Sequence, residues 1–228
     1  MSGEFNLLIN ADTSLLLDAN RTIWIPEHQT LVIADLHAGK VQHFRKHGIP
    51  LPPQAAEDNL TALINSLKKR HPKRVVFLGD LFHSSLNSEF QSFIDRLNDF
   101  RTTNAMEVIL TKGNHDILPT DLYTNNRIGC VDRFELPGIL LTHEPIPHLK
   151  NSNNVLVCGH LHPGVTIIGK GRNKIKLPCF GFCDRTLYMP SFGNLTGTVS
   201  MEWPKQARTW AIIESNQQLL EINASHRR

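Results

Sequence analysis

The sequence lacks the features that define several large classes of protein. It contains no run of about 20 apolar residues, which a membrane-spanning helix would need. It also has no internal repeat and no low-complexity stretch, and its 40% hydrophobic and 20% charged residues exclude disordered, collagen-like and coiled-coil chains. The 228 residues therefore predict one globular domain over residues 1–228, with a full hydrophobic core and no membrane partner. They leave its oligomeric state open.

The number of cysteines and the net charge are also small. The four cysteines form no Cys-x-x-Cys pair, which is typical of reduced, buried thiols and not of a disulfide framework. The first 20 residues contain no Lys or Arg, so we expect no secretory signal and a cytoplasmic location. The net charge of +3 is too small to indicate a nucleic-acid partner by itself, whereas the 12 histidines stand out.

Apolar runs alternate with helical patterns in the first half of the chain, and strands dominate the second half. We predict helices over 54–70 and 87–100, and strands over 5–10, 14–17, 21–26, 31–34, 75–78, 108–110, 139–141, 154–157, 165–168, 174–180 and 211–214. This order predicts an α/β (α+β) fold in which two packed sheets are flanked by helices.

Five of the apolar strands are followed by polar side chains that commonly bind metals. They are Asp35 and His37, Asp80, Asn114, His143, and finally His160 and His162. Open α/β sheets place ligand sites at the carboxyl ends of their strands, so these side chains should converge. Each segment alone is typical of a turn or loop, but their common position after strands favours a shared site.

Seven potential ligands are too many for one four-coordinate ion, so the set predicts two divalent ions. We assign Asp80, from the central cluster, as the carboxylate that bridges them. Oxygen and imidazole ligands without thiolate suit manganese, iron or zinc, and we expect manganese. Such a pair of ions activates a bridging water and neutralises phosphate oxygens, so the chemistry expected is attack of a metal-bridging hydroxide on phosphorus.

His115 and Asp116 follow Asn114 and are expected to be catalytic residues, not ligands. Asn114 is the better ligand of the three. A carboxylate next in sequence could orient the His115 ring, which would then protonate the leaving alkoxide.

These segments together resemble the calcineurin-like metallophosphoesterase superfamily. The matching segments are Asp35-x-His37, Gly79-Asp80, Gly113-Asn114-His115-Asp116, His143 and Gly159-His160-x-His162. The resemblance implies a four-layer αββα metallophosphoesterase sandwich with a dinuclear centre. It also implies that Asp35, His37 and His162 hold one ion and that Asn114, His143 and His160 hold the other, with Asp80 between them.

A narrower resemblance is to the bacterial ligase-associated DNA-damage-response endonuclease family. It rests on Ala34–Lys40, Phe44-Arg45, Gly48-Ile49-Pro50, Asp80–Ser84, Thr142–Pro145, His160–Pro163 and Met189–Gly193, and so spans roughly residues 30–200. This family implies a DNA phosphodiester substrate and a functional association with a DNA ligase and a helicase in repair. The stretch around His83 also resembles the corresponding stretch of double-strand-break repair nucleases, and this resemblance implies that His83 lies near the scissile phosphate.

Residues 40–74 carry eight basic and two acidic residues in a chain of net charge +3. Lys40 and Arg45 follow the Asp35 loop directly and are the candidate phosphate contacts, although a solvated helix end would have the same composition. Two enzymatic hypotheses remain: a metal-dependent DNA phosphodiesterase or nuclease, and a small-molecule phosphoesterase on nucleotides, sugar phosphates or lipid precursors. A non-catalytic scaffold is disfavoured because all eight site residues are present.

Overall fold

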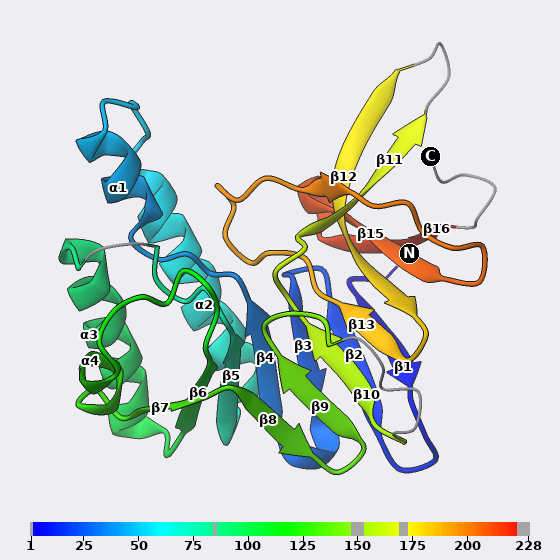
Figure 1. The fold of residues 1–228 in the computed structure, drawn as a ribbon, viewed down its shortest axis with the longest axis horizontal. Helices are drawn as coiled ribbons and strands as arrows, with labels where there is room; N and C mark the ends of the chain where they lie inside the picture. Colours follow the sequence, from blue (N-terminus) through cyan, green and yellow to red (C-terminus); the bar gives the residue numbers. More distant parts are fainter. Residues whose placement is uncertain (1, 84–85, 147–152, 169–172, 223–228) are drawn as a thin grey trace.

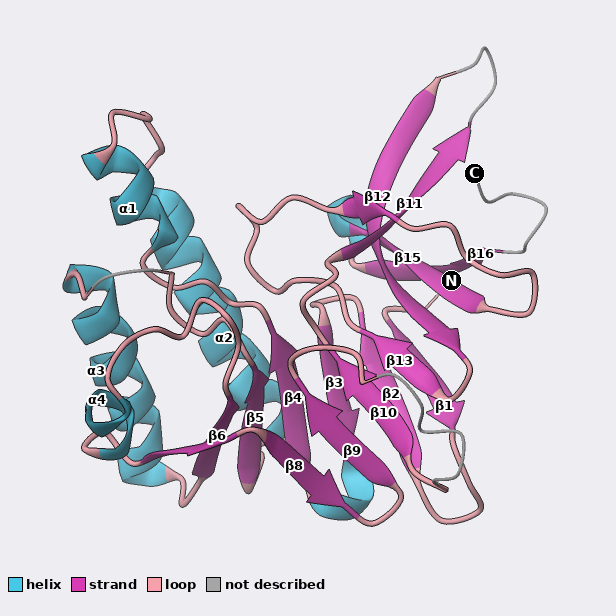
Figure 2. Ribbon diagram, in the orientation of Figure 1, coloured by secondary structure: helices cyan, strands magenta, loops and turns pink. Residues whose placement is uncertain are grey.

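The computed structural model describes residues 2–83, 86–146, 153–168 and 173–222 (Figure 1). Within these ranges two β-sheets pack face to face, and the α-helices lie along the free face of the first sheet (Figure 2). No helix in the described part of the chain has the length and apolar character needed to cross a membrane. Three of the four cysteines are buried, as expected.

The first sheet has seven strands in chain order. They are β1 (Glu4–Leu8), β2 (Ser14–Asp18), β3 (Thr22–Ile25), β4 (Thr30–Ala34), β5 (Arg74–Leu78), β6 (Glu107–Thr111) and β7 (Ile128–Val131). Strands β1 to β4 pair antiparallel, and β4 to β7 pair parallel. Strands β4 and β5 are buried almost throughout, which is why both read as continuous apolar runs.

Four α-helices and a 3-10 turn connect the strands of this sheet: η1 (Pro26–His28), α1 (Lys40–Lys46), α2 (Gln54–Arg70), α3 (Ser88–Thr103) and α4 (Thr120–Thr124). Helix α2 buries Leu60, Leu63, Ile64 and Leu67, whose spacing places them on one face. Helix α3 begins after Asn87, whose side chain accepts a hydrogen bond from the Glu89 N–H. These helices pack on the first sheet and form one core with it.

The second sheet contains nine of the described strands. They are β8 (Arg133–Leu136), β9 (Ile139–Thr142), β10 (Val155–Cys158), β11 (Pro163–Ile168), β12 (Lys174–Cys183), β13 (Thr186–Tyr188), β14 (Val199–Ser200), β15 (Arg208–Ile213) and β16 (Gln218–Ile222); the 3-10 turn η4 (Glu214–Asn216) joins the last two. Strands β9, β10 and β13 are parallel neighbours. Side chains of both sheets form a second core between them.

The expected two-sheet α/β class is therefore confirmed. The arrangement differs in one respect from two sheets enclosed by helices on both sides: the described α-helices all pack on the first sheet. Along β10, Val155 and Val157 face the core between the sheets, and Leu156 and Cys158 face the opposite side. Leu140 of β9 and Tyr188 of β13 lie on that same side, beside Leu156 and Cys158, and form a small cluster with them.

Candidate metal centre

The carboxyl ends of five parallel strands bring all seven predicted ligands together. Strand β4 leads to Asp35 and His37, β5 to Asp80, β6 to Asn114, β9 to His143, and β10 to His160 and His162. Strands β4 to β6 belong to the first sheet and β9 to β10 belong to the second, so the site spans the upper edge of both sheets in Figure 1. The fold thus places the predicted cluster at one edge of the two packed sheets, where Asp35, His37, Asp80 and His143 are buried.

The backbone of this cluster is unusually strained. Asp35, His37, Asp80, His160 and His162 all have positive φ, between 46° and 66°. This left-handed region disfavours residues that carry a Cβ, and such residues gather at functional sites, where the surrounding structure holds them in place. Five of the seven predicted ligands therefore adopt a conformation that local preference alone would not select.

Three glycines allow the strand ends to approach the cluster closely. A Cβ on Gly79 would lie 2.1 Å from Nδ1 of His143, and one on Gly159 would lie 2.6 Å from Oδ2 of Asp35. A Cβ on Gly113 would lie 2.4 Å from Oδ1 of Asp80. Any side chain at these positions would displace a predicted ligand.

The first ligand group consists of Asp35, His37 and His162. Each offers one ligand atom, and these atoms lie within 4.8 Å of one another; Nε2 of His162 is 3.4 Å from Oδ1 of Asp35. Both ring nitrogens of His37 and Nε2 of His162 are buried without a hydrogen-bond partner. Buried polar atoms are rarely left unpaired, so this group fits a bound cation.

The pKa of His37 supports the same reading. Burial, followed by the charge of Lys40 and the neighbouring imidazole of His162, lowers the His37 pKa to about 2. The ring is therefore neutral at physiological pH and keeps a lone pair for a metal, as a ligating histidine requires.

The second group consists of Asn114, His143 and His160. Nε2 of His143 lies 3.2 Å from Oδ1 of Asn114 and 3.1 Å from Nδ1 of His160. The other nitrogen of His143, Nδ1, lies 3.0 Å from the Leu78 carbonyl and can donate to it, which leaves Nε2 with its lone pair toward the cluster. A carboxylate oxygen of Glu144, an exposed residue missed at the sequence level, also lies within 4.8 Å of ring nitrogens of His143 and His160.

Asp80 lies between the two groups. Its Oδ2 is 3.6 Å from Nε2 of His37, and its Oδ1 is 3.6 Å from Nε2 of His143. Its side chain is only 3% exposed, so it has little access to water to compensate its charge. The carboxylate of Asp80 thus lies within reach of both groups, and the oxygen and imidazole donors together fit divalent ions.

Asp116 takes a different role from the one expected. Its buried carboxylate accepts hydrogen bonds from the N–H groups of Gly113, Leu81 and Phe82, at 2.9 to 3.3 Å, and from the hydroxyl of Tyr123. Burial raises the Asp116 pKa, although the hydrogen bonds from the backbone N–H groups act to lower it. Through these contacts Asp116 holds the loops after β5 and β6 together. The sequence had led us to expect that it orients the His115 ring.

The structure places His115 and His83 side by side at the outer rim of the centre. The His115 side chain is exposed, and its ring centroid lies 5.4 Å from that of His37 and 5.2 Å from that of His83. Burial, followed by the charge of Lys40, lowers the His83 pKa to about 4. Both rings can therefore contact a substrate that reaches the centre from solvent.

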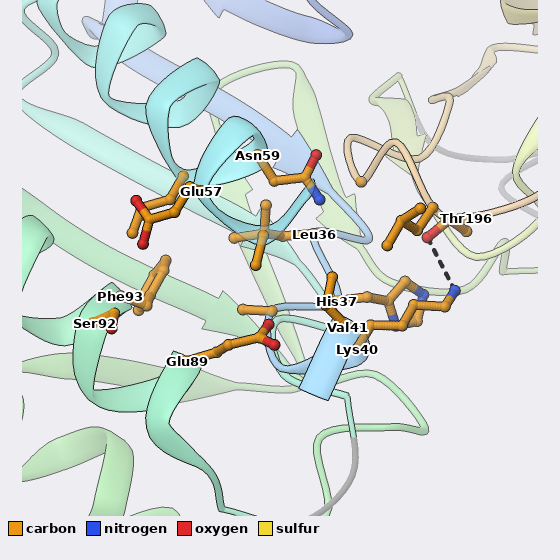
Figure 3. A pocket seen from close by; sticks show the side chains of 15 residues that line it. Leu36, His37, Lys40, Val41, Glu57, Asn59, Glu89, Ser92, Phe93 and Thr196 are labelled. Carbon is orange, nitrogen blue, oxygen red and sulfur yellow. Dashed lines mark hydrogen bonds between the residues drawn. The ribbon is translucent and has the colours of Figure 1, made fainter. Parts of the chain in front are cut away.

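The two basic side chains predicted to contact phosphate, Lys40 and Arg45, differ in position. Lys40 is half-buried and donates a 3.2 Å hydrogen bond to Oγ1 of Thr196, beside His37 (Figure 3). Burial lowers its pKa, and the charges of Asp80 and Asp35 oppose this, so Lys40 lies within electrostatic reach of the centre. Arg45 is exposed on α1, where it donates to the Leu51 carbonyl. Lys40 thus joins the cluster, whereas Arg45 lies on the projecting helix.

Two hollows adjoin the centre. A pocket between α1, α2 and α3 has His37 and Lys40 in its wall, together with apolar side chains such as Leu36 and Phe93 (Figure 3). A more open cleft of about 630 Å³ lies on the side of His143 and is lined by Lys112, Arg133 and Glu144 among others. The sequence offered no signal for Lys112 or Arg133, because neither belongs to a motif.

Comparisons with known proteins identify the family of the chain and a solved structure of similar fold. The profile of the calcineurin-like phosphoesterase family matches residues 28–171. Among solved structures, the nuclease MPE of Pseudomonas putida superposes with a TM-score of 0.74 at 24% identity, over 96% of this chain and 100% of its own. The phosphoesterase Yfce of E. coli aligns over 85% of this chain and 97% of its own, with a TM-score of 0.43 at 17% identity. No curated protein sequence matches the chain.

Proposed function

The chain belongs to the calcineurin-like phosphoesterase family and is therefore a hydrolase of phosphoesters, and we propose that its substrate is a phosphodiester bond of DNA. The observation that supports a metal-dependent reaction most directly is the convergence of seven oxygen and imidazole donors, three of whose buried nitrogens have no hydrogen-bond partner. The likeness in fold to a nuclease over nearly the whole chain supports a nucleic-acid substrate and a single domain over residues 1–228.

We propose that Asp35, His37 and His162 hold one divalent ion, that Asn114, His143 and His160 hold the other, and that Asp80 bridges them. Manganese is our first choice because the donors are carboxylate, amide and imidazole without thiolate. When bound, such ions supply an activated water and neutralise the charge of the phosphate.

The chain's own residues then position the substrate and move a proton. His115, exposed at the rim, donates a proton to the leaving alkoxide. His83 and Lys40, which lie beside His37, contact the scissile phosphate. Arg45, on the projecting α1, contacts a phosphate farther along the strand.

A role in DNA repair, in the cytoplasm and alongside a DNA ligase and a helicase, is the biological setting that we propose. It rests on the resemblance of the Asp35, His83 and His143 segments to the ligase-associated endonucleases.

A comparison of model substrates tests the reaction class. The manganese-loaded protein should hydrolyse bis-p-nitrophenyl phosphate, a diester, faster than p-nitrophenyl phosphate, a monoester, and should cleave DNA. A preference for the monoester, with DNA left intact, would favour the small-molecule phosphoesterase.

A further inference from the structure

One arginine far from the predicted ligands in sequence is tied to the backbone of Asp35. Arg21 lies in the turn between β2 and β3, where its N–H donates to the Asp18 carbonyl. Its φ is 62°, a conformation for which such turns usually select glycine or asparagine. Its side chain is only 11% exposed, although it starts from a turn. A residue that breaks the local preference and is buried in this way has a reason beyond the turn itself.

The guanidinium of Arg21 holds the loop that follows β13. Its Nη1 donates to the Ser191 carbonyl at 3.0 Å and reaches the Gly193 carbonyl at 3.5 Å. Its Nη2 pairs with the carboxylate of Glu214. The planar fork of an arginine can bind in two directions at once, which a lysine cannot reproduce.

The same loop in turn holds the Asp35 turn. The Asp35 carbonyl accepts hydrogen bonds from the Ser191 hydroxyl at 2.9 Å and from the Gly193 N–H at 3.3 Å. The Phe192 N–H donates to the Ala34 carbonyl at 2.8 Å. A Cβ on Gly193 would lie 2.7 Å from the Leu36 carbonyl oxygen, so the loop lies directly against the Asp35 turn.

Asp35 needs this support because its φ is 52° and its carboxylate is fully buried. Such a backbone persists only where the surroundings hold it. We propose that Arg21 is a positioning residue for the metal centre, which acts through Ser191 and Gly193 to fix the carboxylate of Asp35. This inference rests on the proposed function, because it gives Asp35 the role of a metal ligand.

The position of Arg21 predicts an unequal effect on the two ions. Asp35 belongs to the group with His37 and His162. Its carboxylate also accepts hydrogen bonds from the His160 N–H, at 2.9 and 3.2 Å, and lies 3.6 Å from Nδ1 of His143. The loop of residues 191–193 itself makes no described hydrogen bond to Asn114, His143 or His160. Loss of the Arg21 fork should therefore weaken the ion that Asp35 ligates more than the other ion, which Asp35 reaches only through His143 and His160. A merely structural role would lower stability without this selectivity.

The test is a titration of the metal-free full-length protein with Mn²⁺, in which electron paramagnetic resonance measures free Mn²⁺. Arg21→Gln should bind one ion about tenfold or more weakly, as is usual when a residue that supports a ligand is lost, and should bind the second ion with a clearly smaller loss of affinity. Arg21→Lys keeps the charge without the fork, so its affinity for the weakened ion should lie between that of Arg21→Gln and that of wild type.

The matched control is Arg101→Gln. Arg101 also donates to two backbone carbonyls, those of Asn126 and Arg127, but these precede β7 and do not contact the centre. The Arg101→Gln variant should bind both ions with wild-type affinity even if its melting temperature falls. If Arg21→Gln does not fold, as judged by circular dichroism, the selective loss is read from Arg21→Lys.

Wild-type affinity for both ions in the Arg21 variants would overturn the inference, and so would an equal loss in Arg101→Gln. Failure of the proposed function would appear differently, as a wild-type protein that binds fewer than two ions or does not hydrolyse diesters.

Discussion

The backbone N–H of His115 donates a 2.9 Å hydrogen bond to Oδ1 of Asp80. The residue proposed as the proton donor is thus fixed through its main chain to the carboxylate proposed as the bridge, and its side chain is exposed to solvent. Removal of the ring should leave the bridge in place.

His115→Ala should therefore retain both metal ions and lose about 10²-fold or more in kcat, the usual contribution of a general acid. The loss should be smaller for substrates with activated leaving groups, which need little protonation. Metal analysis and turnover of a DNA substrate and of bis-p-nitrophenyl phosphate measure these effects. Loss of metal as complete as in His143→Ala would show that His115 is a ligand.

Gly159→Ala should damage the centre although it adds a single methyl group. The new Cβ would lie 2.6 Å from Oδ2 of Asp35 and 2.9 Å from Cβ of Ala34, so a buried ligand must move. We expect metal affinity to fall about tenfold or more and the free energy of unfolding to fall by roughly 1–3 kcal/mol.

The control for that substitution is Gly197→Ala, because no atom lies within 4 Å of the Cβ that it would add. It should change stability by less than about 0.5 kcal/mol. Calorimetric metal titration and urea unfolding compare the two variants, and equal metal affinity in both would contradict the close approach at Gly159.

A second electrostatic cluster predicts how stability depends on pH. Burial alone would raise the pKa of Asp18, but hydrogen bonds from Lys69 and from the Asn20 N–H, with the charges of Lys69 and Arg70, hold it below its usual value. A carboxylate with a lowered pKa in the folded state contributes stability above its unfolded pKa of about 4, and this contribution is lost as the pH falls through the folded pKa.

Lys69→Met should accordingly lower the free energy of unfolding by about 1 kcal/mol at pH 7, since Arg70 still pairs with Asp18. Its difference from wild type should shrink below pH 4. Urea unfolding of both proteins across this range measures the effect, and a difference that is constant with pH would show that Lys69 acts through packing.

Substitutions of Arg45 and of Lys40 should differ in their effects on DNA binding and on turnover. Arg45→Ala should reduce the slope of log K against log salt by about 0.7 to 0.9 and leave turnover of bis-p-nitrophenyl phosphate intact, because that substrate has no flanking phosphate. Lys40→Ala should impair both, since Lys40 lies within reach of Asp35 and Asp80. The control Arg208→Ala, on β15 and paired with Glu221, should change neither. An unaltered salt slope in Arg45→Ala would exclude α1 as a DNA contact.

The sequence predicts well those features that depend on neighbours along the chain. Helix α2 has the predicted bounds, Gln54 to Arg70, because its apolar spacing and basic last turn are local signals. The buried strands β4 and β5 differ from the prediction by one residue each. Helix α1, with seven residues, is too short for a helical period to be recognised.

Features that depend on contacts distant in sequence were not predictable. Asp116 braces Leu81 and Phe82, which are 35 and 34 residues away, and nothing beside it in the sequence indicates this. Arg21 reaches Ser191 only because the two sheets pack together. The positive φ of five predicted ligands likewise reflects the assembled cluster and contradicts their local preferences.

Cleavage of DNA as a function of bound manganese tests the central proposal most directly. The metal-free protein should leave DNA intact, and cleavage should rise as two ions bind per chain. Asp80→Asn should weaken both ions and abolish cleavage at the same manganese concentration, because Asp80 lies 3.6 Å from a ring nitrogen of each group. A wild-type protein that binds two manganese ions and still leaves DNA intact while it hydrolyses phosphomonoesters would contradict the proposal.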